Sequence, residues 1–431
     1  MNYPEAMDYL VNLTKFGFNF GLDRIKYLLA QLGDPQNKIK TIHIGGTNGK
    51  GSTSAMLASI LQAAEYKVGV FTSPHLHSYS ERVVINGAQI PEVRVAELLT
   101  RLQPILAQMV VAGQEHPTEF EVNTALALLY FSEEQVDLAI IEVGLGGAID
   151  STNVINPLLS VITNVGMDHM DYLGNTLEEI TTVKAGIIKE QAIVVTAAER
   201  PEVLEVIEAT CQAKSARLIK VGENYRWESL TATPLGQRFN LYGPQQNYCD
   251  LELKLLGAHQ LVNAATAVAV VEALGRFCGL EVTAEQVKLG LRQAQWPGRL
   301  EIVRPGVLLD GAHNLDGAES LALALHQVFT YRKLILCIGM LADKEREKVL
   351  AVLAPLADKI VVTKPNSPRA GNWQDMAKEA AKYVSDVVLC EEIPEGVERA
   401  LALAEAGDLV CITGSLYMIA AARAHLLGIA N

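Results

Sequence analysis

The sequence predicts an α/β fold of two domains: a larger amino-terminal domain built around a phosphate-binding loop, and a smaller, Rossmann-like domain after it. Within residues 42–61 a β-branched run enters a glycine-rich loop and then an apolar helical pattern, in the order strand, loop, helix. In the last third of the chain, buried-type strands alternate with helical patterns, as in a mostly parallel sheet. The stretch 295–299, Gln-Trp-Pro-Gly-Arg, breaks the pattern, so we expect domains at 1–295 and 296–431.

The composition limits the class of protein. The 431-residue chain can form two or three domains with ample cores, and its 49% hydrophobic content is ordinary for a globular protein. A formal net charge of −13 argues against a nucleic-acid-binding surface, so an anionic substrate needs local cations, helix amino termini or a metal. We expect neither a signal peptide nor a run that spans a membrane. Six scattered cysteines without a Cys-x-x-Cys motif fit a cytoplasmic protein without disulfides or zinc.

The glycine-rich loop Gly46–Ser52 has the residue types of a nucleotide phosphate site. Its glycines let the backbone turn tightly with N–H groups inward, and the next helix adds partial positive charge at its amino terminus. Lys50 can reach the outer phosphates, and Ser52 or Thr53 can face a Mg²⁺. One extra glycine, Gly51, separates the lysine from the hydroxyl of the standard pattern. A plain glycine-rich turn is the alternative, which the lysine and the strand–helix context oppose.

Two later strands end in candidate ligands. Ser73 follows the buried-type strand 67–71, at the end where open α/β sheets bind ligands, although a serine in a turn or cap is the structural alternative. Glu142 lies near the end of the apolar strand 137–143. A carboxylate there is costly unless it is paired or ligates a metal, so we expect Glu142 to hold Mg²⁺ or a water of Mg²⁺.

The next strand end carries Asp168 and His169. A histidine placed there between two acids is as consistent with a metal or phosphate role as with a structural one. Lys184 lies two turns into a helix that Thr176 can cap, and by itself it would be a solvated lysine.

The last third of the chain repeats this pattern without a phosphate loop. Asp310 and His313 follow one strand, and Ser415 follows another. We therefore expect this region to close over the nucleotide of the first domain.

Eight stretches, in order along nearly the whole chain, resemble the ATP-dependent amide ligases related to the Mur enzymes, and within them the folylpolyglutamate synthase/dihydrofolate synthase family. Each stretch alone is weak, whereas the ordered set is specific. The stretches are 46–52, 72–76, 142–147, 168–169, 184–189, 297–301, 310–314 and 414–417. The resemblance implies a Mur-ligase-like central domain that binds ATP and folate, and a carboxyl-terminal ligase domain that closes over glutamate and ATP.

The resemblance also implies roles for single residues. Lys184 would be carbamylated, which turns a cation into an anion that supports a second Mg²⁺ and requires surroundings that lower the pKa of the amine. His313 would lie near the transferred phosphoryl group or the incoming amine and, with Lys50 and Lys184, would be catalytic. The ATP-binding residues would be Thr47, Asn48, Gly49, Lys50, Gly51, Ser52, Asn263, Arg299 and Asp310. The Mg²⁺-binding residues would be Ser73, Glu142, His169 and Lys184.

Two more binding regions follow from the resemblance. The folate-binding residues would be Phe20, Asp23, Phe120, Glu121, Thr124, Ile149, Asp150 and Ser151. The glutamate-binding residues would be Ser415 and Tyr417. For Glu121, a capping box with Thr118 is the structural alternative. Ala148 departs from the family, because many members with dihydrofolate synthase activity carry arginine there, and this argues against dihydropteroate use more than against polyglutamylation.

The implied reaction is ATP-dependent addition of L-glutamate to tetrahydrofolate or folylpolyglutamate through an acyl phosphate, with 7,8-dihydropteroate as a further candidate. The expected partners are these small molecules rather than nucleic acid or a membrane, and we expect a cytoplasmic monomer. A muropeptide-type amino-acid ligase is one alternative, but the segment before residue 42 is short for the extra domain it needs. A nucleotide-dependent switch without ligation is another, although it would not need Glu142, His169, Lys184 and His313.

Overall fold

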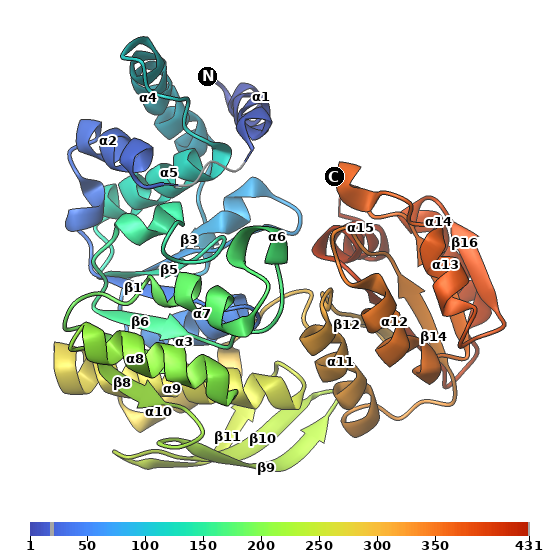
Figure 1. The fold of residues 1–431 in the computed structure, drawn as a ribbon. Coiled ribbons are helices and arrows are strands. Elements are labelled where there is room, and N and C mark those ends of the chain that lie inside the picture. Colours follow the sequence, from blue (N-terminus) through green and yellow to red (C-terminus); the bar gives the residue numbers. More distant parts are fainter. Residues whose placement is uncertain (18–20, 430–431) are drawn as a thin grey trace. The chain divides into compact units, whose positions relative to one another are not determined.

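The computed structural model describes residues 1–17 and 21–429, which form two compact units, each containing a sheet (Figure 1). The first unit comprises Met1–Arg226, Leu241–Tyr248 and Val262–Leu291. The second comprises Trp227–Asn240, Cys249–Leu261 and Arg292–Asn431. Two segments from the middle of the chain thus belong to the second unit. The division of functions expected at residue 296 stays a prediction.

The first unit is built on an eight-stranded sheet with the order β4-β3-β2-β5-β1-β6-β7-β8. The strands from β2 to β8 in this order run parallel, and β3 and β4 form an antiparallel edge. Buried parallel strands read as apolar runs, which is why the sequence shows them clearly. The bounds are β1 Thr41–Gly45, β2 Val68–Phe71, β3 Val83–Ile85, β4 Ala88–Gln89, β5 Leu138–Glu142, β6 Leu159–Ile162, β7 Ile193–Thr196 and β8 Arg217–Lys220.

The register of this sheet brings the candidate ligands to one edge. Ile44 of β1 pairs with Glu142 of β5, and Gly45 of β1 pairs with Ile162 of β6. On the other side of β5, Phe71 of β2 pairs with Ile141. The carboxyl ends of β2, β5, β1 and β6 are therefore neighbours.

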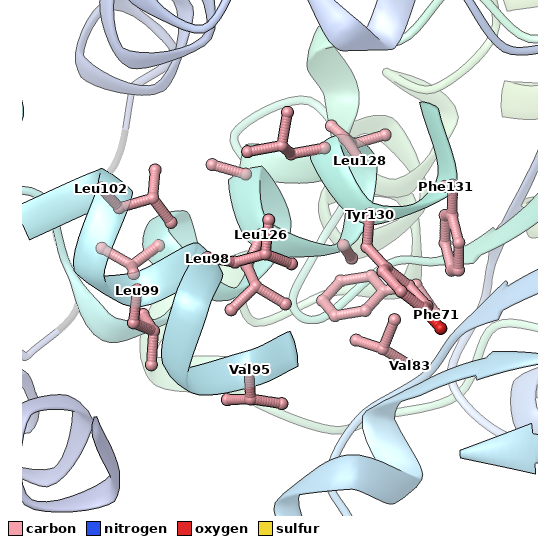
Figure 2. Close-up of a cluster of buried hydrophobic side chains, with 14 of the residues drawn as sticks. Phe71, Val83, Val95, Leu98, Leu99, Leu102, Leu126, Leu128, Tyr130 and Phe131 are labelled. Carbon is pink, nitrogen blue, oxygen red and sulfur yellow. The ribbon is translucent and has the colours of Figure 1, made fainter. Parts of the chain in front are cut away.

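The helices of the first unit bury a large apolar cluster against this sheet. Figure 2 shows Leu98 of α4, Leu126 of α5 and Phe71 of β2 within it, and all three side chains are almost completely buried. Thr118 begins α5 with a capping box to Glu121, which is the structural alternative to a folate-binding role for Glu121. The bounds are α1 Tyr3–Leu13, α2 Asp23–Gln31, α3 Lys50–Ala63, α4 Glu92–Val111, α5 Glu119–Glu133, α6 Met170–Leu173, α7 Leu177–Ala185 and α8 Pro201–Ala213, with short 3₁₀ helices η1 Thr14–Phe16, η2 Pro35–Asn37, η3 Tyr79–Arg82 and η4 Ser151–Val154.

The second unit is built on a six-stranded sheet with the order β12-β13-β17-β14-β15-β16, in which only the β12–β13 pair of the described strands is antiparallel. Apolar clusters lie on both faces. The strands are β12 Glu301–Arg304, β13 Val307–Leu309, β14 Leu334–Ile338, β15 Lys359–Thr363, β16 Val387–Cys390 and β17 Leu409–Thr413. The helices are α11 Leu315–Gln327, α12 Arg346–Leu353, η5 Ala354–Leu356, η6 Pro368–Ala370, α13 Asp375–Ala380, α14 Ile393–Leu403 and α15 Leu416–Leu427. The predicted α/β class is confirmed.

Several middle elements contribute residues to both units. They are a three-stranded sheet of order β11-β10-β9 with β9 Arg226–Thr233, β10 Gly236–Tyr242 and β11 Asn247–Leu253, and helices α9 Ala258–Cys278 and α10 Ala284–Gln293. Helix α9, with 21 residues, is by length and composition apolar enough to cross a membrane. The expectation that the chain holds no such run is therefore wrong. In the structure 72% of that apolar window is buried inside the protein, as in a core helix.

Candidate active site

The phosphate-binding loop connects β1 to α3 and includes two glycines that no other residue can replace without strain. Gly46 has φ 138° and Gly49 has φ 87°, both in the left-handed region. A Cβ on Gly46 would lie 2.0 Å from Thr163 Oγ1, and one on Gly49 would lie 2.5 Å from Asn263 Oδ1. The loop therefore packs closely against Thr163 and Asn263. The contact with Asn263 agrees with the prediction that Asn263 and the loop bind the same nucleotide.

The segment after β6 fixes the shape of the loop, which the sequence did not reveal. The Thr47 N–H donates to the Asn164 carbonyl at 2.8 Å, and the Asn48 N–H donates to Asn164 Oδ1 at 2.8 Å. Thr163 Oγ1 donates to the Asn48 carbonyl at 2.7 Å. Because β6 pairs directly with β1, these contacts hold the loop from the adjacent strand end.

Two lysines share one carbonyl of this loop. Lys50 Nζ donates to the Gly46 carbonyl at 3.2 Å and to the Thr47 carbonyl at 3.1 Å. Lys184 Nζ, from α7, donates to the same Gly46 carbonyl at 2.9 Å. The structure therefore brings the two predicted catalytic lysines together at the phosphate-binding loop.

Lys184 is buried rather than solvated, since 5% of the residue is exposed. Burial lowers the pKa of its amine to about 7, and the positive charge of Lys50 acts in the same direction against the raising effect of Asp168 and Asp150. Near neutral pH a large fraction of this amine is uncharged and nucleophilic.

Glu142 and Ser73 come from the strand ends next to the loop. Glu142 is the last residue of β5 and is 5% exposed, while Ser73 lies half-buried two residues beyond β2. A carboxylate and a hydroxyl are oxygen donors of the kind that Mg²⁺ takes, together with several waters. Among the described residues, no group of three or more His, Cys, Asp and Glu side chains gathers as a metal centre.

His169 lies farther along the same edge. It precedes α6 in a left-handed conformation with φ 53°, and its backbone N–H donates to Asp168 Oδ1 at 2.9 Å. Its side chain is 38% exposed, with Nε2 3.9 Å from Asp168 Oδ2. The ring is thus accessible beside an acid.

Three of the residues predicted to bind folate, Phe120, Ile149 and Asp150, lie against a second glycine-rich loop, Gly144–Gly147. A Cβ on Gly144 would lie 2.4 Å from Phe120 Cζ, and one on Gly147 would lie 2.6 Å from the Lys184 carbonyl. The loop therefore lies against both the Phe120 ring and the helix that carries Lys184.

The other predicted folate residues differ in their contacts. Thr124 Oγ1 and Ser151 Oγ are 3.0 Å apart, within hydrogen-bond distance of each other. The buried Glu121 carboxylate caps its own helix and lies 3.2 Å from Arg24 Nε. Asp23 is exposed at the start of α2, and Ile149 is half-buried. Phe20 lies outside the described residues.

Asp150 is buried and accepts several hydrogen bonds from its own chain. The Leu145 N–H donates to Oδ2 at 2.7 Å, and the Thr152 N–H donates to Oδ1 at 2.9 Å. Burial raises the pKa of this carboxyl, while these donors oppose the rise. Its observed contacts are those of a residue that shapes the Gly144–Gly147 loop.

In the second unit, a buried carboxylate lies at the exit of β13. Asp310 accepts hydrogen bonds from the Leu300 and Ala312 N–H groups, both at 2.9 Å. Arg299 lies close by, because a Cβ on Gly311 would be 2.0 Å from its Nη1. Sequence reasoning missed His259 here: burial lowers the pKa of its ring, Asp310 raises it and Arg299 lowers it.

His313 Nδ1 lies 2.8 Å from the Gly311 carbonyl. Since a carbonyl only accepts, Nδ1 carries a proton and donates it to this carbonyl. Ser415 caps α15, because its Oγ accepts the Met418 N–H and donates to the Gly339 carbonyl. Tyr417 is 44% exposed in the same helix.

The fold and this site define an ATP-dependent ligase of the Mur type. The family model of the Mur ligase middle domain matches residues 44–271, and that of the Mur ligase glutamate ligase domain matches residues 298–416. The chain belongs to the folylpolyglutamate synthase/dihydrofolate synthase family.

Relatives of full length support this assignment. The dihydrofolate synthase/folylpolyglutamate synthase of Bacillus subtilis is 39% identical over 98% of this chain and 99% of its own. The structure of Mycobacterium tuberculosis folylpolyglutamate synthase complexed with ADP has a TM-score of 0.91 at 33% identity, covering 99% of each chain. That of E. coli FolC in complex with DHPP and ADP has a TM-score of 0.88 at 31% identity, covering 100% of this chain and 97% of that one.

Proposed function

We propose that this protein adds L-glutamate to tetrahydrofolate and to folylpolyglutamates, with ATP as the energy source. The observation that carries the proposal is the meeting of Lys50 and Lys184 on the Gly46 carbonyl, beside the strand that ends in Glu142. A carboxylate that must attack a phosphoryl group needs positive charge and hydrogen-bond donors there, because two anions have to meet, and Lys50 supplies that charge while Lys184 lies beside it.

The nucleotide site is the loop from Thr47 to Ser52. Its backbone N–H groups and the amino terminus of α3 suit the phosphates, and Lys50 suits the outer ones. Asn263 supports this assignment because its side chain abuts Gly49. Arg299 and Asp310 are proposed to contact the nucleotide on the strength of the family resemblance.

We propose that Mg²⁺ is held by Glu142, Ser73 and His169. The bound ion would neutralise negative charge on the phosphates of ATP. Lys184 is proposed to be carbamylated: its neutral nitrogen attacks the carbon of CO₂, a C–N bond forms, and one proton leaves. The pKa of about 7 supports this step, because an ordinary lysine amine is almost fully protonated at neutral pH. The carbamate would be a buried anion beside Lys50, and the positive charge of Lys50 would stabilise it.

In the proposed reaction an oxygen of the folate carboxylate attacks the γ-phosphorus of ATP, giving an acyl phosphate and ADP. The α-amine of glutamate then attacks the acyl carbon, the amide forms, and phosphate leaves. His313 Nε2 can accept the proton that the amine loses, because Nδ1 is held by the Gly311 carbonyl. Ser415 and Tyr417 are proposed to bind glutamate.

A second candidate substrate is 7,8-dihydropteroate. The bifunctional name of the Bacillus subtilis relative favours it, and Ala148 in place of the common arginine opposes it. Of the alternatives, a muropeptide-type ligase is disfavoured because the relatives that match over their full length are folylpolyglutamate and dihydrofolate synthases. That the protein acts as a monomer in the cytoplasm stays a prediction.

The test supplies purified protein with ATP, Mg²⁺ and glutamate, and adds tetrahydrofolate or dihydropteroate in parallel reactions. We expect folate products heavier by one or more glutamyl residues by mass spectrometry, and ADP release that requires both folate and glutamate. ADP release without either substrate would favour a nucleotide-dependent switch instead.

A further inference from the structure

A buried histidine lies on the strand that leads into the phosphate-binding loop. His43 is in the middle of β1, three residues before Gly46, and none of its surface is exposed. Its Nε2 lies 2.8 Å from Thr152 Oγ1, which belongs to η4 more than a hundred residues later. The roles proposed above leave this contact unexplained.

The direction of the hydrogen bonds follows from the chemistry of the partners. The Thr152 hydroxyl donates to Asp150 Oδ1, which as a carboxylate oxygen only accepts. The proton between His43 and Thr152 must then come from Nε2. Burial lowers the pKa of His43 to about 3, so the ring is neutral, and within the described part of the chain Nδ1 has no hydrogen-bond partner. A chain of donors therefore runs from His43 through Thr152 to Asp150.

The end of this chain sets the shape of the Gly144–Gly147 loop. Asp150 Oδ2 receives the Leu145 N–H at 2.7 Å, so one carboxylate joins the hydrogen-bond chain to the loop backbone. The backbone of Gly144 touches the Phe120 ring. A shift of Asp150 would therefore move the Gly144–Gly147 loop where it lies against the Phe120 ring.

We propose that His43 and Thr152 are positioning residues for the folate substrate: through Asp150 they hold the Gly144–Gly147 loop in the shape that receives it. The inference rests on the proposed function, because it takes the Phe120 side of this loop as the folate side. The inference adds that His43 and Thr152 set folate affinity through Asp150 without touching the folate themselves.

The rival explanation is that His43 only fills space in β1. The two explanations predict different kinetic effects, because His43 lies just before the phosphate-binding loop. If His43 only fills space, its replacement would damage β1, disturb that loop first and raise the KM for ATP. A positioning role through Thr152 raises the KM for tetrahydrofolate and leaves that for ATP within about twofold.

The experiment compares paired variants in steady-state glutamate addition. His43→Leu and Thr152→Val remove the donors, whereas His43→Gln and Thr152→Ser keep a donor in nearly the same place. Thr41→Val is the matched control: Thr41 lies on the same face of β1, is buried, and its Oγ1 has no hydrogen-bond partner in the described residues.

We expect His43→Leu and Thr152→Val to raise the KM for tetrahydrofolate about tenfold, the size of effect that loss of one buried hydrogen bond produces. His43→Gln, Thr152→Ser and Thr41→Val should stay within about twofold of the wild type. Equal rises in both KM values, or no rise in the Thr152→Val protein, would overturn the inference. If His43→Leu fails to fold, Thr152→Val decides alone, because threonine and valine side chains have nearly equal volumes. A wild type that adds no glutamate would instead overturn the proposed function.

Discussion

The carboxyl edges of the two sheets carry similar residues and use them differently. In the first unit, Lys184 and Glu142 are ionisable groups that are almost fully buried, and the amine of Lys184 has a strongly lowered pKa. In the second unit, Asp310 and Ser415 are similarly buried, and each makes hydrogen bonds with two backbone groups. The first edge therefore holds an amine whose charged form is disfavoured by burial, whereas the second holds a carboxylate and a hydroxyl that fix loop geometry.

This difference teaches that a polar residue at a strand exit is only a candidate until its partners are known. A buried amine that is held by one carbonyl stays available for chemistry. A carboxylate that accepts two backbone N–H groups stabilises a turn, whatever else it does. Mutations at the first edge should therefore reduce turnover, and those at the second edge should also reduce stability.

The largest expected effect is the loss of charge at the first edge. Lys50→Ala or Glu142→Ala should lower kcat by about a thousandfold or more, because each removes a group that offsets phosphate charge, while circular dichroism stays unchanged. Lys378→Ala is the control, since that lysine is 82% exposed in the second unit. Near-normal glutamate addition by either variant would remove the distinction between the edges.

The next effect concerns CO₂. In CO₂-free buffer we expect kcat to fall about tenfold, and added bicarbonate should restore it in the wild type but not in Lys184→Met. Only the neutral amine reacts with CO₂, and its fraction rises with pH through a pKa of about 7. Restoration should therefore be faster at about pH 8 than at about pH 6. Activity that is indifferent to CO₂ at both pH values would show that Lys184 acts as a plain amine.

The strand–loop–helix at Gly46–Lys50 and the acid at Glu142 could be predicted because local pattern determines them: β-branched strands, glycines and a lysine follow one another in sequence. The capping box of Thr118 and Glu121 was equally local. Most strand exits were visible because parallel strands are apolar throughout.

The contacts that shape the site could not be predicted, because they depend on strand order. Asn164 holds the phosphate-binding loop since β6 lies beside β1, and His43 reaches Thr152 across more than a hundred residues. The burial of Lys184 has the same origin, since its helical pattern alone suggested a solvated side chain. Sequence order does not state which strands become neighbours.

At the second edge, Asp310→Ala should lower the free energy of unfolding by about 2 kcal/mol, because two backbone N–H groups lose a charged acceptor. Asp310→Asn, which keeps one acceptor oxygen, should lose less. Urea unfolding followed by tryptophan fluorescence reports this unit alone, since Trp227, Trp296 and Trp373 all belong to it. An unchanged midpoint for Asp310→Ala would mean that the carboxylate is not a structural element.

The smallest effect is expected at Ser415, and it separates capping from glutamate binding. Ser415→Ala should cost about 1 kcal/mol of stability through loss of the α15 cap. Ser415→Thr keeps a hydroxyl that can both accept the Met418 N–H and donate to the Gly339 carbonyl, and it should retain that stability. If Ser415 also binds the substrate, Ser415→Ala should raise the KM for glutamate and Ser415→Thr should not. If the KM for glutamate is unchanged in Ser415→Ala while stability falls, Ser415 serves the helix alone, and the glutamate site must be sought at other residues.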